Sequence, residues 1–177
     1  MFRSATKSEL TQLRRSFDSW GIFEFIESQV LLVKADPYNR NRYVSITTEP
    51  SKDVLNQLAV YPKRVGLVIG ELQNKKFTPS LQGAEVIAKF GRNFPYILVN
   101  EIAEGLVLYG RDILGDSVLE VSKGLGQNKK VIILNQNRES IGLGQTRFSG
   151  ENIFRKGVVT VYTLLDLGMY LRDQDNC

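Results

Sequence analysis

The first part of the chain carries the hydrophobic spacing of a helix. Apolar residues from Leu10 to Phe17 repeat at intervals of three and four, which is typical of one buried helix face. Thr6 and Glu9 can form a capping box at its start, and Gly21 is a residue type that commonly ends helices. We therefore predict a helix over residues 7–20.

Shorter apolar runs and turn residues mark further elements up to position 91. Two β-type runs enclose a segment with Pro37 and Asn39, which is typical of a hairpin. Gly70 and Gly91 indicate where a strand and a helix stop. The predicted elements are a hairpin of residues 30–33 and 43–46, a helix from Pro50 through Leu58, a strand over 65–69, and a helix over 81–90 with Val86, Ile87 and Phe90 on one face.

The pattern changes at residues 91–95. Beyond them, four apolar β-type runs alternate with glycine-containing turns and no long helix separates them, which favours a small barrel. We predict an α+β fold, with an N-terminal domain of residues 1–94 built on an antiparallel sheet with flanking helices. A C-terminal β-barrel of residues 95–177, able to fold alone, follows. Its runs are 96–99, 118–121, 131–134 and 158–162, with Val118, Val131, Ile133, Val159 and Val161 expected in the core.

Composition places the chain among globular proteins. Of its 177 residues, 42% are hydrophobic and 24% charged, far from the range in which chains stay disordered. No apolar run approaches the roughly 20 residues that span a bilayer, and Arg3, Lys7 and Glu9 stand where a signal peptide would be apolar. A single cysteine, Cys177, rules out an internal disulfide. We expect a cytoplasmic protein with no membrane partner, or a nuclear or nucleolar one if the source is eukaryotic.

The chain contains no histidine, which narrows the available chemistry. Ser/His and Cys/His nucleophile pairs and most zinc sites are excluded, leaving carboxylate, lysine or tyrosine chemistry. The phrase Gly-Leu-Gly-Gln occurs at 124–127 and 142–145, but neither copy continues as a phosphate-binding loop, so we interpret both as tight turns. Asp112 and Asp116 are too close together on a predicted turn to suggest a buried acid/base pair. We predict no catalytic residue, no metal, no cofactor and no small-molecule substrate.

Positive charge is concentrated in the second half of the chain. The net charge is +4, and residues 123–156 contain seven basic and two acidic residues. Phe148 and Phe154 lie among the last three of these cations, and Tyr38 lies near Arg40, an arrangement found on surfaces that bind single-stranded RNA. A solvated basic surface with both phenylalanines in the core is equally consistent with the pattern.

An ordered set of short phrases runs through the second half. Its most distinctive member is the last, Asp-Leu-Gly-Met-Tyr-Leu-Arg at 166–172. In order and spacing, the set resembles the pseudouridine synthase and archaeosine transglycosylase (PUA) domain over about residues 94–173. The resemblance implies a PUA-type barrel that binds RNA. The earlier phrases are Ala103-Glu104-Gly105, Leu108-Tyr109-Gly110, Asp116-Ser117-Val118 and Ile141-Gly142-Leu143-Gly144.

The first half narrows the family. Residues 2–6, 43–45 and 76–81 resemble the N-terminal domain of the large-subunit ribosome biogenesis factors called Nip-seven, and residues 108–111 resemble the same family. Around residues 145–156 the chain departs from eukaryotic members and is similar to the more basic archaeal ones. The resemblance implies a non-catalytic, archaeal protein that binds ribosomal RNA or its precursors during large-subunit assembly and rRNA maturation. It also implies a protein partner in ribosome assembly on the N-terminal domain.

The resemblance further implies where RNA binds. PUA domains contact RNA around the helix after their first strand and through strands near their C-terminal end. The RNA-binding residues expected here are Arg111, Lys129, Lys130, Arg147, Arg155, Lys156 and Arg172, the last also placed to pair near Asp166. Three alternatives remain open: a translation or recycling factor with a PUA domain, an enzyme or accessory subunit in RNA modification, and a protein-interaction scaffold without RNA contact.

Overall fold

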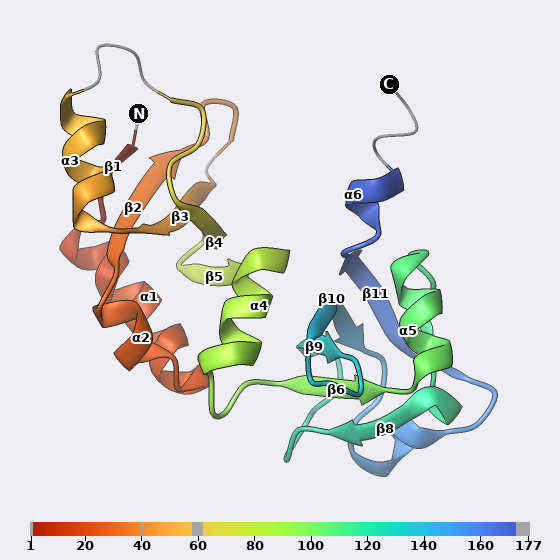
Figure 1. The fold of residues 1–177 in the computed structure, drawn as a ribbon. Coiled ribbons are helices and arrows are strands. Elements are labelled where there is room, and N and C mark those ends of the chain that lie inside the picture. Colours follow the sequence, from red (N-terminus) through yellow and green to blue (C-terminus); the bar gives the residue numbers. More distant parts are fainter. Residues whose placement is uncertain (1, 40, 58–61, 173–177) are drawn as a thin grey trace. The chain divides into compact units, whose positions relative to one another are not determined.

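The computed structural model describes residues 2–39, 41–57 and 62–172. The chain divides into two compact units, residues 1–93 and 94–177. Each unit contains its own sheet (Figure 1), and the two are described separately. Among the residues described, no helix is long and apolar enough to cross a membrane.

Unit 1 is an antiparallel five-stranded sheet with helices packed on it. Its strands lie in the order β1-β2-β3-β4-β5, so each strand pairs with its neighbour in the sequence. Helix α4 packs against β4, α2 against β2, and α1 against β5. The elements are β1 (Phe2–Ser4), α1 (Lys7–Trp20), α2 (Phe23–Glu27), β2 (Val30–Ala35), β3 (Arg42–Thr47), α3 (Glu49–Gln57), β4 (Leu67–Gln73), β5 (Lys76–Pro79) and α4 (Leu81–Phe90).

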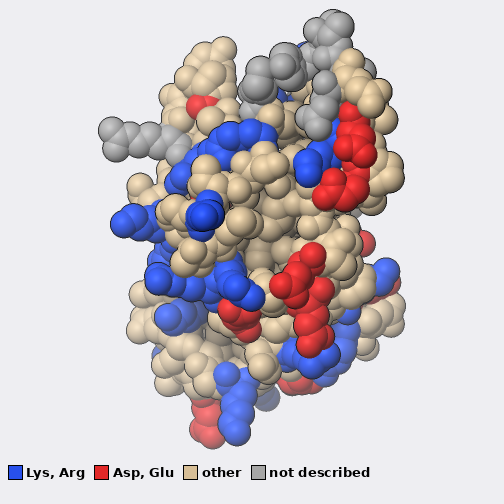
Figure 2. Space-filling model, turned by 90° about the vertical axis from the view of Figure 1, so that its left-hand side faces the viewer, with Lys and Arg blue, Asp and Glu red and all other residues tan. Residues whose placement is uncertain are grey.

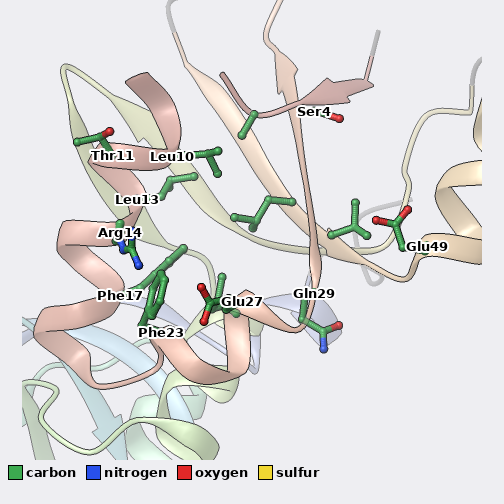
Figure 3. Close-up of a pocket in the computed structure, with 14 residues that line it drawn as sticks. Ser4, Leu10, Thr11, Leu13, Arg14, Phe17, Phe23, Glu27, Gln29 and Glu49 are labelled. Carbon is green, nitrogen blue, oxygen red and sulfur yellow. The ribbon is translucent and has the colours of Figure 1, made fainter. Parts of the chain in front are cut away.

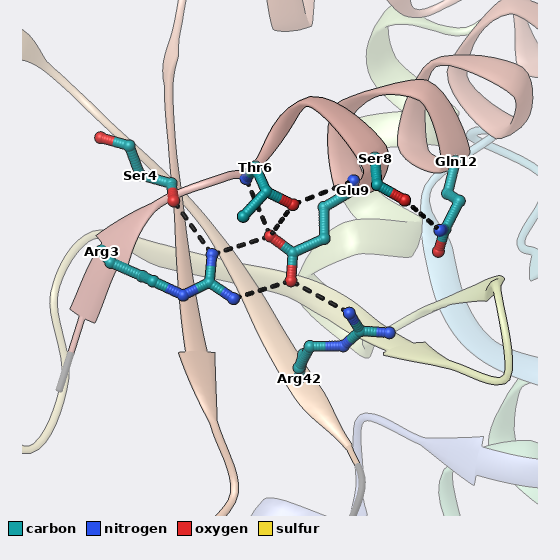
Figure 4. A network of polar contacts seen from close by, with 7 residues as sticks. All are labelled: Arg3, Ser4, Thr6, Ser8, Glu9, Gln12 and Arg42. Atoms are coloured by element: carbon teal, nitrogen blue, oxygen red, sulfur yellow. Dashed lines mark hydrogen bonds and ion pairs between the residues drawn. The ribbon is translucent and has the colours of Figure 1, made fainter.

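The start of α1 is held by the predicted capping box (Figure 4). The Thr6 hydroxyl accepts from the Glu9 amide at 3.3 Å, and the Glu9 carboxylate accepts from the Thr6 amide at 2.9 Å. At the other end, Gly21 has φ +66°, a left-handed conformation that a side chain would strain. The helix therefore begins and ends where its sequence predicts.

Other predictions for unit 1 need small corrections. The predicted hairpin and the predicted boundaries of α4 are confirmed. The helix predicted to start at Pro50 begins at Glu49, and its predicted last residue, Leu58, lies outside the described residues. The prediction that a strand stops at Gly70 is wrong, because β4 continues to Gln73 through pairing with β5. Phe90 is not on the buried face of α4 but is 40% exposed, stacked on Phe25.

Unit 2 is a six-stranded sheet that curves into a nearly closed barrel. The strand order is β7-β11-β10-β9-β6-β8, and all neighbours are antiparallel except β6 and β9. Helix α5 packs against β10 and β11. The elements are β6 (Tyr96–Val99), α5 (Glu101–Leu108), β7 (Ile113–Leu114), η1 (Gly115–Ser117), β8 (Val118–Val121), β9 (Lys130–Leu134), β10 (Ser140–Thr146), η2 (Gly150–Phe154), β11 (Val159–Asp166) and α6 (Met169–Arg172). The predicted α+β class with a C-terminal β-barrel is thus confirmed.

The core of unit 2 agrees with the prediction at four of five positions. Val118, Val131, Ile133 and Val161 are buried, whereas Val159 is only half-buried. The register between β11 and β7 shifts after Val159, so alternation along β11 does not hold across this point.

The second Gly-Leu-Gly-Gln phrase is not a turn. Residues 142–145 lie inside β10, which pairs with β9 and β11. A Cβ added at Gly142 would lie 2.6 Å from the Leu165 carbonyl oxygen, and one added at Gly144 would lie 2.8 Å from a methyl carbon of Val161. The glycines are there because neighbouring chain segments approach too closely for side chains.

Candidate nucleic-acid interface

Three strands of unit 2 carry a row of polar and aromatic side chains across the sheet. Lys130 of β9 is paired with Gln145 of β10, and Gln145 is paired with Tyr162 of β11. Directly opposite residues of an antiparallel sheet present their side chains on the same face. Lys130 and Tyr162 are exposed, so this row forms part of the outer surface.

Two arginines lie over aromatic rings next to this row. The Arg147 guanidinium carbon is 5.4 Å from the centre of the Phe148 ring and 5.9 Å from that of Tyr162. The Arg155 guanidinium carbon is 5.5 Å from the centre of the same Phe148 ring. We call Arg147, Phe148, Arg155 and Tyr162 the cation–aromatic cluster. Within the described residues, neither arginine forms an ion pair, so no carboxylate offsets its positive charge.

The loop that carries Arg155 is fixed against the short helix η1. Gly115 lies so close to it that an added Cβ would be 2.3 Å from the Arg155 carbonyl oxygen. The Asp116 carboxylate accepts from the Gly157 amide at 3.0 and 3.1 Å. These contacts position Arg155 beside Phe148, and Lys156 lies exposed between the two anchored residues.

Lys129 and Arg111 lie on either side of the cluster along the sheet. The Lys129 amide donates to the Thr146 hydroxyl at 2.9 Å, which places Lys129 beside the residue that precedes Arg147. The Arg111 carbonyl accepts from the Thr163 hydroxyl at 2.8 Å, which places Arg111 beside the residue that follows Tyr162. Both side chains are exposed.

Arg172 lies beside Gly110, the residue before Arg111, and is bonded within unit 2. Its guanidinium donates to the buried Asp166 carboxylate at 2.9 Å and to the Leu108 carbonyl oxygen. These bonds tie α6 to the end of α5. The pairing with Asp166 is as the sequence predicts, and a contact of Arg172 with RNA stays a prediction.

The sequence leaves open whether Phe148 and Phe154 lie in the core or on the surface, and the structure places them differently. Phe148 is partly buried against the unit 2 core, whereas Phe154 is 40% exposed. In unit 1, Tyr38 is 95% exposed, but Arg42 pairs with Glu9, and Arg40 lies outside the described residues. Tyr162 is the member of the cluster that sequence reasoning missed. Its position opposite Gln145 depends on a strand pairing that the sequence did not reveal.

The two aspartates on the predicted turn, Asp112 and Asp116, have structural partners. Asp112 and Asp116 are exposed, and each accepts a backbone amide across the fold, from Thr163 and Gly157 respectively. Among the residues that the structure describes, no group of three or more Cys, Asp or Glu side chains could hold a metal ion. Figure 2 shows that the basic side chains on the drawn face lie in several groups, some of them directly beside acidic side chains.

Comparison with known proteins defines the class. A family model described as the UPF0113 PUA domain matches residues 95–175. A conserved PUA domain protein from Thermoplasma acidophilum has the same fold, with a TM-score of 0.67 at 13% identity over 98% of this chain and 99% of that one. Unit 2 is therefore a PUA domain, a class that generally binds RNA.

The whole chain has a relative of higher identity. The UPF0113 protein of Archaeoglobus fulgidus is 32% identical over 175 residues, which cover 98% of this chain and 95% of that protein. The UPF0113 protein of Aeropyrum pernix is 31% identical over 108 residues, covering 60% of this chain and 56% of that one. The chain belongs to the UPF0113 family.

Proposed function

We propose that this protein binds RNA without catalysing a reaction and acts in large ribosomal subunit assembly and rRNA maturation. The cation–aromatic cluster is the observation that carries the RNA-binding part. The ribosomal part is supported by the resemblance of residues 2–6, 43–45 and 76–81 to the Nip-seven factors.

The cluster combines the two kinds of group that single-stranded RNA requires. Arg147, Arg155 and the neighbouring Lys130 can each neutralise a phosphate, and this releases counterions. The Tyr162 ring, 41% exposed, offers a face on which an unpaired base can stack. Lys and Arg contacts to phosphate position the strand without reading its sequence, while stacking favours unpaired bases.

Salt dependence tests the proposed surface. About four phosphate contacts to single-stranded RNA give a slope of about −3 when the logarithm of the binding constant is plotted against the logarithm of the salt concentration, because each contact contributes about −0.7. Replacing Arg147, Arg155 and Lys156 with alanine should flatten the slope by about 2 and weaken binding to all sequences. Fluorescence anisotropy with a labelled single-stranded oligonucleotide at several salt concentrations measures both.

Two further variants make this test specific. The double variant Arg147→Lys with Arg155→Lys keeps both positive charges, so the salt slope should stay the same. RNA affinity should fall, because lysine has no planar group that can stack. Alanine at the exposed unit 1 residues Lys63, Arg64, Lys75 and Lys76 should change little. Wild-type affinity in the triple alanine variant, or a larger loss in the unit 1 variant, would overturn the assignment.

Crosslinking in cells and sequencing of the bound RNA tests the ribosomal role.

A further inference from the structure

Unit 1 contains a cavity that RNA binding does not explain. It has a volume of about 460 Å³ and lies between α1, α2 and the start of β2 (Figure 3). Leu13, Phe17 and Ile26 form its buried floor, and Leu10, 42% exposed, stands at its edge. The volume is within the range of sites that take up apolar groups of ligands.

One wall of the cavity is an open strand edge. Strand β1 pairs with β2 only from Leu32 to Lys34. Val30 and Leu31 line the cavity and pair with β3 on their other side. Within the described residues, no strand pairs with their outer edge, so their backbone groups on that side can accept an added strand.

The side chains that line the cavity carry one net negative charge. Glu27 and Glu49 line it, and Arg14 is the basic residue among the lining side chains. The Arg14 guanidinium lies 4.3 Å from the centre of the Phe23 ring, and Glu49 pairs with Lys52 at 3.2 Å. The Glu27 carboxylate forms no ion pair or hydrogen bond with any described residue. An RNA strand would bring phosphates toward these carboxylates, which is unfavourable.

We propose that this groove binds an extended basic segment of a partner protein. One large apolar side chain of the segment enters the cavity, its backbone pairs with Val30 and Leu31, and a Lys or Arg meets Glu27. Main-chain pairing provides affinity in this mode, and the side-chain pocket provides specificity. The site is separate from the cation–aromatic cluster and does not depend on the RNA-binding proposal.

A random peptide library identifies the preferred ligand. Phage displaying random 12-residue peptides are selected on the full chain, and recovered sequences are synthesised with a fluorescent label. We expect recovered peptides to share an apolar residue flanked by Lys or Arg. In ¹⁵N NMR spectra, such a peptide should shift the amide signals of Gln29, Val30 and Leu31, because Gln29 lines the cavity and Val30 and Leu31 form the open edge.

Matched variants locate the binding. Leu10→Arg and Glu27→Lys should each weaken peptide binding by about tenfold or more, because both place positive charge beside a basic ligand. Leu67→Arg changes a leucine of nearly equal exposure (41%) on β4, and Glu85→Lys reverses the charge of an exposed carboxylate on α4. Neither control residue lines the cavity, so each should leave affinity within about twofold of the wild type.

Three results would overturn the proposal. The first is a selection that recovers no peptide able to bind the free protein. The second is binding by Leu10→Arg and Glu27→Lys that is as tight as binding by the controls. A single-stranded RNA oligonucleotide that shifts the amides of residues 29–31 would make the groove part of an RNA surface. Urea unfolding of all four variants excludes loss of fold as the cause, and Glu27→Lys alone remains informative if Leu10→Arg does not fold.

Discussion

Two pairs of arginines, one pair in each unit, are held in opposite ways. In unit 1, Arg3 and Arg42 converge on the single buried carboxylate of Glu9, with nitrogen–oxygen distances of 2.8 and 3.1 Å (Figure 4). In unit 2, Arg147 and Arg155 lie on aromatic rings. Neither of them forms an ion pair with any carboxylate in the described part of the chain.

This difference distinguishes structural arginines from those available to a ligand. A carboxylate neutralises an arginine and fixes it in the fold, whereas an aromatic ring orients the guanidinium and leaves its charge. Arg172 shows that the distinction does not follow the boundary between units, because it lies in unit 2 but pairs with Asp166. The partner of each arginine, and not its position in a basic segment, indicates its role.

Removing the Glu9 carboxylate should have the largest effect on stability. Glu9 is 2% exposed and accepts hydrogen bonds from Arg3, Arg42 and Thr6. Glu9→Gln leaves two cations facing an amide and should lower the free energy of unfolding by about 3 kcal/mol. Urea unfolding measures this loss. The control is Glu49→Gln, which removes an exposed ion pair and should lower the free energy of unfolding by less than about 0.5 kcal/mol. Equal losses in both variants would contradict a central role for Glu9.

The same carboxylate should make unit 1 sensitive to acid. Hydrogen bonds from Arg3, followed by those from Thr6, lower the pKa of Glu9 to about 2 despite its burial. In the unfolded chain, a glutamate carboxyl has a pKa of about 4.3. The ionised Glu9 carboxylate therefore contributes its full stabilisation above about pH 4.3, and this contribution is lost as the pH falls toward about 2. The difference in unfolding free energy between wild type and Glu9→Gln should shrink by roughly 1 to 2 kcal/mol from pH 6 to pH 3. A difference independent of pH would show that folding leaves the pKa of Glu9 unchanged, and a difference that grows toward pH 3 would show that Glu9 is protonated in the fold.

Arg172 should affect stability more than RNA affinity. Arg172→Ala removes the bonds to Asp166 and to the Leu108 carbonyl oxygen, and it leaves the Asp166 carboxylate, 5% exposed, without the Arg172 cation. We expect a loss of about 2 kcal/mol in unfolding free energy, with RNA affinity and salt slope unchanged. Arg138→Ala, at an exposed pair with Glu120, is the control and should cost less than about 1 kcal/mol. A flattened salt slope in Arg172→Ala would instead place this residue on the RNA surface.

The sequence predicts elements whose information is local. The α1 helix has a capping box, a hydrophobic face and a glycine stop within residues 6–21, and its boundaries are as predicted. The short elements β1, α2 and β7 have two to five residues, too few for a period to be visible. The PUA resemblance implies a helix after the first strand, but the residue pattern does not predict α5. Asn100 caps it and Glu101 lies in its first turn, but Ile102 and Leu106 are apolar on its exposed face.

The candidate site was predictable in its charges but not in its geometry. Arg147 and Arg155 are close in sequence, so their proximity follows from the chain itself. Tyr162 joins them only through the pairing of β10 with β11, and the β4–β5 pairing that extends β4 past Gly70 is hidden in the same way. Side chains brought together by strand pairing leave no signal in a single sequence.

The smallest expected change in RNA affinity distinguishes the aromatic part of the cation–aromatic cluster from its charged part. Tyr162→Ala removes a stacking surface but no charge, so RNA affinity should fall by about 1 kcal/mol at every salt concentration while the slope stays constant. Arg147→Ala should flatten the slope by about 0.7, because one phosphate contact is lost. Tyr162→Phe keeps the ring and should bind like the wild type. Tyr38→Ala, at the exposed tyrosine of unit 1, is the matched control and should leave both quantities unchanged. If Tyr162→Ala instead flattens the slope as Arg147→Ala does, Tyr162 serves only to orient Arg147, and no base stacks on it.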